Sequence, residues 1–106
     1  MLPEHDVETV RRWAEALTPA EVRDRSRAEV ELAPRSLTIY ESSLMGDQWI
    51  RVSVARLGWS GPSKLWTLYR FDSNSKAHRY EFLEPRKRVT DLLDEIDDDP
   101  TFIFWG

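Results

Sequence analysis

The chain has 106 residues, of which 41% are hydrophobic and 32% are charged, and its formal net charge is −4. This length suits one domain over residues 1–106, and an aromatic fraction of 11% excludes a disordered chain, which would be poor in large apolar side chains. The absence of cysteine excludes disulfides, a thiolate nucleophile and cysteine-ligated metal sites, and it favours a cytoplasmic location.

The first expected element is a helix that follows Pro3. Its first turn is acidic, and apolar residues recur on one face: Val7, Val10, Trp13, Ala14 and Leu17. The segment Thr18-Pro19-Ala20-Glu21 resembles a capping box with proline at the first helical position. We therefore expect a second, short helix that ends near Arg23.

Five strands are expected in the middle of the chain, because apolar and polar residues alternate there between turn-forming residues. They are the segment around Val30 and Leu32, the segment Leu37 to Tyr40, Trp49 to Leu57, Lys64 to Phe71, and Lys76 to Leu83. A polar break is expected from Ser42 to Asp47, and a four-residue hairpin loop from Asp72 to Ser75. Because every connection is short, an antiparallel meander is the simplest topology.

A last helix is expected between Pro85 and Pro100, with an apolar stripe formed by Val89, Leu92, Leu93 and Ile96. The predicted fold class is therefore α+β: an N-terminal helix with a short second helix, a five-stranded antiparallel meander, and a C-terminal helix, with the terminal helices on one face of the sheet. The final residues Phe102 to Trp105 are all large and apolar, so we expect this tail to dock, on its own chain or on a second copy.

Charge is unevenly distributed along the chain. Residues 1–34 contain 5 basic residues (Lys or Arg) and 8 acidic ones (Asp or Glu). Residues 35–88 contain 10 basic and 5 acidic residues, and residues 89–106 contain no basic and 6 acidic residues. A basic sheet between two acidic helical segments could attract an anionic partner, or sheet and helices could simply attract one another. No signal peptide or membrane-spanning stretch is expected, because the longest wholly apolar run has only the four residues Phe102 to Trp105.

Several segments resemble a family of small bacterial proteins known only as a domain of unknown function. They are Ser36 to Glu41 (SLTIYE), Trp66 to Tyr69 (WTLY), His78 to Tyr80 (HRY), Leu92 to Asp97 (LLDEID) and Asp99 to Gly106 (DPTFIFWG). The resemblance covers nearly the whole chain and is strongest in its last forty residues. It implies no activity, ligand or site residue.

The hairpin of the last two predicted strands offers a candidate binding patch. A four-residue loop would place Tyr69 opposite His78 and would leave Trp66, Arg70 and Arg79 together on the other face. An aromatic ring flanked by guanidinium groups is suited to stacking on a base while arginine contacts phosphate. The alternative is a cation–π or ion-pair cluster that only keeps the sheet soluble.

His78 is the one candidate for proton transfer, with Asp72 or Glu81 to orient it, but no nucleophile motif accompanies it. Packing of His78 against Tyr69 is the alternative. The acidic residues Asp97, Asp98 and Asp99 offer oxygen ligands for a divalent cation, although their spacing matches no EF-hand. We expect arginine or lysine from the sheet to neutralise them instead, since negative charge at a helix C-terminus is unfavourable.

The sequence therefore predicts a small cytoplasmic protein, without catalytic activity or cofactor, that binds a partner through an exposed sheet face around Trp66, Arg70 and Arg79. The partner would be another protein or a second copy of the chain, and no membrane contact is expected. Two alternatives remain open: binding of single-stranded nucleic acid by the same patch, and a small hydrolase or nuclease that uses His78 with a carboxylate.

Overall fold

A computed structural model describes all 106 residues and contains two α-helices, one short 3₁₀ turn and one five-stranded sheet. In chain order the elements are α1 (Glu4–Leu17), the 3₁₀ turn η1 (Ala20–Val22), β1 (Ser26–Ala33), β2 (Ser36–Met45), β3 (Gln48–Ser60), β4 (Leu65–Phe71), β5 (Ala77–Arg79) and α2 (Val89–Asp98). All neighbouring strands are antiparallel and lie in chain order across the sheet. The predicted α+β fold with a meander is confirmed.

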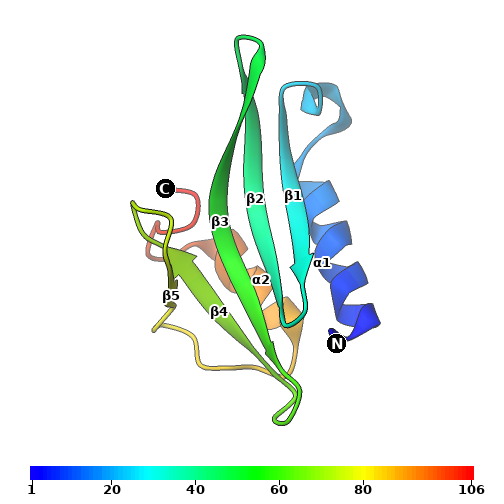
Figure 1. Cartoon of the computed structure of the whole chain (residues 1–106), viewed down its shortest axis with the longest axis vertical. Coiled ribbons are helices and arrows are strands. Elements are labelled where there is room, and N and C mark those ends of the chain that lie inside the picture. Colours follow the sequence, from blue (N-terminus) through cyan, green and yellow to red (C-terminus); the bar gives the residue numbers. More distant parts are fainter.

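The two helices cover one face of the sheet. Figure 1 shows α1 beside β1 and α2 behind the sheet, while the long β2–β3 hairpin extends past both helices. The apolar stripes predicted from helical spacing point inward, so Val10, Leu92 and Ile96 are fully buried. Together with Leu37 and Leu57 on the strands they belong to one cluster of 15 buried residues. The opposite face of the sheet carries no helix, and this is the feature that positions the site.

The β2–β3 hairpin is longer than the sequence predicts. The segment Ser42 to Asp47 is not a polar break, because β2 continues to Met45 and reverses at Gly46-Asp47 into β3. Gly46 has φ +66°, the left-handed conformation that a tight hairpin turn needs and that glycine adopts without strain. Ser42 and Ser43 pair with Arg51 and Ile50 of β3, and the Ser42 hydroxyl donates to Glu29 of β1.

The β4–β5 hairpin differs from the prediction in register. Its loop has five residues, 72–76, so Phe71 pairs with Ala77 and Tyr69 pairs with Arg79 instead of His78. This one-residue shift puts each side chain of β5 on the opposite face of the sheet from the one predicted relative to β4. β5 has only three residues and ends at Arg79, whereas a strand to Leu83 was predicted.

Two helix starts also differ from the sequence expectations. Thr18 does not cap η1, because Pro19 occupies the N-cap position and the Thr18 hydroxyl accepts the Ala28 amide at 3.0 Å. The last helix begins at Val89, not at Pro85, since the chain between them first forms a bridge from Arg86 back to β4. Of the apolar tail only Phe104 is buried, in a loop and not in a strand, while Phe102, Ile103 and Trp105 stay exposed.

Candidate functional site

The three residues predicted to form a binding patch do not lie together. Trp66 is fully buried, whereas Arg70 is half-buried on the same side of β4 and Arg79 is exposed on the opposite side of the sheet. The Trp66 indole Nε1 donates to Asp6 Oδ2 at 2.8 Å, and its ring packs 5.0 Å from that of Trp59. Trp66 is a core residue that joins β4 to α1, so the prediction that it faces solvent is wrong.

The face of the sheet away from the helices, called the open face below, carries a different set of basic and aromatic side chains. It faces the reader in Figure 1, with α2 behind the sheet. Three guanidinium groups lie over rings on it: Arg27 is 4.2 Å from the Trp49 ring centroid, Arg51 is 3.7 Å from that of Tyr40, and Arg56 is 5.3 Å from that of Phe71. These six residues are the three Arg–aromatic pairs.

Strand alternation explains why these side chains share one face. Ile39, Ala55 and Leu57 are buried on the helix side. Tyr40 follows Ile39 in the chain, and Arg56 lies between Ala55 and Leu57. Successive side chains of a strand point to opposite faces, so both residues point away from the helices. Arg51 reaches Tyr40 on the neighbouring strand β2, and Arg56 reaches Phe71 on the neighbouring strand β4. Arg27 on β1 reaches across β2 to Trp49 on β3.

Most of the positive charge on the open face has no acidic partner. Arg51 is the exception, with Glu31 at 3.2 Å and Glu29 at 3.8 Å. Arg27 and Arg56 form no ion pair, and the same holds for Arg35 and Arg79. α2, on the other face, carries only acidic charges. The molecule therefore has a basic open face and an acidic helical face, although its net charge is −4.

A hollow of about 380 Å³ lies at the end of the open face where β2 begins and β3 ends; we call it the arginine hollow. Its polar lining consists of Arg35, Ser36, Arg56, Ser60, Thr67 and Tyr69, and it includes no carboxylate. Gly58 forms part of the floor, and a Cβ atom there would lie only 2.9 Å from Tyr69 Cε2. Glycine at this position lets the Tyr69 ring lie against the strand backbone.

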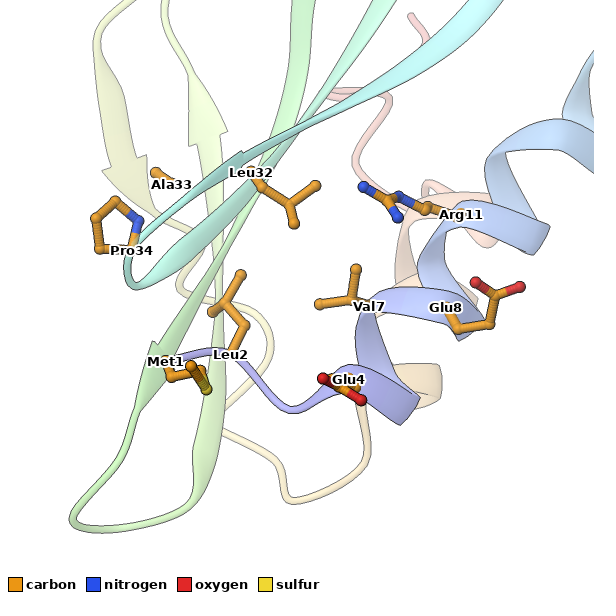
Figure 2. A pocket seen from close by; sticks show the side chains of 9 residues that line it. All are labelled: Met1, Leu2, Glu4, Val7, Glu8, Arg11, Leu32, Ala33 and Pro34. Atoms are coloured by element: carbon orange, nitrogen blue, oxygen red, sulfur yellow. The ribbon is translucent and has the colours of Figure 1, made fainter.

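The largest hollow, of about 690 Å³, lies between α1 and the β1–β2 turn. Figure 2 shows Leu2, Val7 and Leu32 pointing into it, with Glu4, Glu8 and Arg11 arranged along α1. The three charged residues are exposed, and acidic groups outnumber basic ones. This groove is apolar at its centre and lacks the excess of positive charge that marks the arginine hollow.

His78 and Asp72 form a close pair at the tip of the β4–β5 hairpin. His78 Nε2 lies 2.6 Å from Asp72 Oδ2, and Asp72 Oδ1 accepts the amides of Asn74 and Lys76 at 2.8 and 3.0 Å. The hydrogen bond from His78, and then that from Lys76, lower the pKa of Asp72 to about 2. His78 sits opposite Arg70, not Tyr69, and neither member of the pair lines the arginine hollow or the hollow between α1 and the β1–β2 turn. The pair closes the hairpin loop.

The acidic run at the end of α2 is held by groups other than those predicted. Both carboxylate oxygens of Asp97 accept the Trp13 indole N–H, at 3.0 and 3.1 Å, and those of Asp99 accept the amides of Phe104 and Trp105, at 3.0 and 2.9 Å. No arginine or lysine of the sheet forms an ion pair with this run, so that expectation is wrong. Asp98 is exposed, and no three acidic or histidine side chains converge as metal ligands.

Sequence reasoning missed all six residues of the Arg–aromatic pairs as site residues. Trp49 and Arg51 were placed in a predicted strand, but Ser42 to Asp47 was treated as a loop, which removed the residues that pair with them on β2, Leu44 and Ser42. The dipeptide Gly46-Asp47 between two alternating segments was the available signal for a two-residue hairpin turn.

No helix of this chain combines the length and the apolar composition required to cross a bilayer. Comparison with curated proteins and with solved structures finds no significant match. A family model described as a domain of unknown function, DUF3024, matches residues 2–106, which confirms the resemblance seen in the sequence. The chain therefore belongs to the DUF3024 family.

Proposed function

We propose that the protein is a non-catalytic binding module that holds single-stranded nucleic acid against its open face. The observation that carries this proposal is the set of three Arg–aromatic pairs on a sheet face without helical cover. They replace the predicted patch around Trp66 as the working surface.

Each Arg–aromatic pair supplies the two kinds of contact that an unpaired nucleotide accepts. A base can stack on an aromatic ring or on the plane of a guanidinium group, while guanidinium N–H groups donate to phosphate. The ring beneath each arginine also restricts the guanidinium group, so less conformational entropy is lost when it binds. In the Arg56 pair, Nε donates to Thr38 Oγ1 at 3.0 Å, which fixes that group further and leaves both Nη groups for a ligand.

The spacing along the strand suits a chain-like ligand. Trp49 and Arg51 are two residues apart on one face of β3, which corresponds to about 7 Å, and Arg56 lies farther along the same strand. A polyanion lying along β3 would meet these groups in succession. The local positive charge supports such contacts, while the acidic helices keep nonspecific attraction at the rest of the surface weak.

The test is a fluorescence anisotropy titration with a labelled single-stranded oligonucleotide of about 20 nucleotides, at salt concentrations from about 50 to 200 mM. Arg27→Gln and Arg56→Gln should each weaken binding severalfold. Each should also reduce the slope of log affinity against log salt concentration by about 1, the effect of losing one phosphate contact. Trp49→Ala should weaken it by roughly fivefold or more, the usual effect of losing one stacked base.

Arg12→Gln is the matched control, because it removes the same charge from the exposed side of α1. It should leave the affinity unchanged. Absence of binding at low salt, or an equal loss of affinity in the Arg12→Gln variant, would refute the proposal, since the open face would then have no special role.

A protein partner is the second candidate, supported by a separate observation. The β2–β3 hairpin beyond the helices exposes four large apolar side chains, Met45, Trp49, Ile50 and Val52, each between 41% and 60% accessible. Tryptophan beside arginine is also typical of the residues that dominate protein interfaces. Sedimentation velocity over a range of concentrations tests self-association: a dimer lost in the Ile50→Ser variant would support this candidate, and a monomer throughout would exclude the homodimer.

A further inference from the structure

The arginine hollow combines positive charge with hydroxyl groups, and none of its charge is neutralised. Arg35 reaches it from the β1–β2 turn and Arg56 from β3, and neither guanidinium group has an acidic partner. Hydroxyl groups of Ser36, Ser60 and Thr67 complete the polar lining. Two arginines that line one hollow together with several hydroxyl groups offer donors that match the oxygen atoms of a phosphate group.

The same hollow offers aromatic surface next to these donors. Tyr69 lines it, and its ring is brought close to the sheet because Gly58 has no side chain. A planar ring of a ligand could therefore stack beside a phosphate held by Arg35 and Arg56. The volume of about 380 Å³ falls within the range of about 300–1,000 Å³ that is usual for small-molecule sites.

We infer that the arginine hollow binds the phosphate monoester of a nucleotide, with the phosphate on Arg35 and Arg56 and the base against Tyr69. The nucleotide could be free or could be the phosphorylated end of a nucleic acid chain, because both present the same group. The second source deepens the proposed function and rests on it, since a strand bound along the open face would then end in this hollow.

The first measurement is isothermal titration calorimetry with three probes: adenosine monophosphate, adenosine, and inorganic phosphate. Adenosine monophosphate should bind more tightly than inorganic phosphate, which lacks the ring, and adenosine should bind at least tenfold more weakly. Arg35→Gln should weaken binding of the monophosphate by about tenfold or more, because a charge-assisted contact is lost. Arg35 is exposed in a turn, so this variant should fold like the natural chain, and circular dichroism checks that it does.

The control is again Arg12→Gln, which changes the net charge equally at a distant place and should leave the affinity for the monophosphate unchanged. Equal affinity for adenosine and its monophosphate, no heat with the monophosphate at millimolar concentration, or unchanged binding in the Arg35→Gln variant would each overturn the inference.

The second measurement compares oligonucleotides with and without a terminal phosphate, at the 5′ and at the 3′ end, by anisotropy. Tighter binding of one phosphorylated end, abolished by Arg35→Gln, identifies a nucleic acid terminus as the source. Binding of the free monophosphate without any binding of oligonucleotides supports the hollow and refutes the proposed function. Binding of oligonucleotides with no effect of a terminal phosphate, together with no binding of the monophosphate, refutes the hollow and leaves the proposed function standing.

Discussion

Replacement of Trp66 tests the assignment of the two sheet faces, because the sequence predicts this residue in solvent and the structure places it in the core. Its side chain is fully buried, packs on Trp59 and donates to Asp6. Trp49, by contrast, is 41% accessible on the open face. Replacement of Trp66 should therefore lower the free energy of unfolding much more than replacement of Trp49.

The size of the effect follows from the buried area. A tryptophan buries roughly 150–250 Å², which at about 25 cal/mol per Å² gives about 4–6 kcal/mol, and measured Trp→Ala changes in cores cost about 3–5 kcal/mol. Trp66→Ala would remove much of the total stability of a small domain, typically about 5–15 kcal/mol. Trp66→Phe keeps a ring and loses mainly the hydrogen bond to Asp6, so we expect about 2 kcal/mol. Trp49→Ala should cost about 1 kcal/mol or less.

The assay is urea unfolding followed by far-ultraviolet circular dichroism, which does not depend on tryptophan fluorescence. With a slope of about 2 kcal/mol per molar urea, Trp66→Phe should lower the midpoint by about 1 M, and Trp49→Ala by less than half of that. A midpoint for Trp66→Phe close to that of the natural chain, or a larger loss in Trp49→Ala, would refute the assignment of the faces.

Three further predictions concern other contacts of the core and its loops. Tyr80→Phe leaves the Glu95 carboxylate without its 2.7 Å donor and should lower the free energy of unfolding by about 1.5 kcal/mol in urea at pH 7. Burial raises the pKa of Tyr80 above 10.0, so the stability of the natural chain should fall as pH rises from 10 through the pKa of the folded state. This fall should be absent from the variant. The carboxyl carbon of Asp72 should titrate at about 2 by nuclear magnetic resonance and move toward 3.8 in His78→Gln; a midpoint already near 3.8 would contradict the pairing. Truncation after Thr101 removes buried Phe104 and should lower the melting temperature while the oligomeric state stays the same, whereas loss of a dimer at unchanged melting temperature would show that the tail docks between chains.

The helices and the order of the strands could be predicted because they depend on local periodicity. The stripe of α2, with Leu92 and Ile96, repeats at helical spacing and is buried as expected. Register could not be predicted in the same way, since it depends on loop length. A loop of five residues after Phe71, one more than expected, puts Arg79 on the face opposite Trp66, so the face of β4 that carries Trp66 and Leu68 loses the arginine that made it look solvent-exposed.

The site was harder to predict than the fold because its residues come from separate hairpins. Each Arg–aromatic pair joins two strands, so it exists only when the register of both is correct. Ser42 shows the difficulty: it reads as a loop residue, yet it lies in β2, is buried, and donates to Glu29. Composition alone does not reveal a hydrogen bond of this kind between strands.

The most direct test of the open face as a binding surface is a nuclear magnetic resonance titration that follows the arginine Nε–Hε signals while single-stranded oligonucleotide is added. The signals of Arg27, Arg51 and Arg56 should shift together and saturate at one dissociation constant, and that of Arg12 on α1 should stay in place. Shifts confined to Arg12 and the amides of α2, with the three open-face arginines unchanged, would contradict the account.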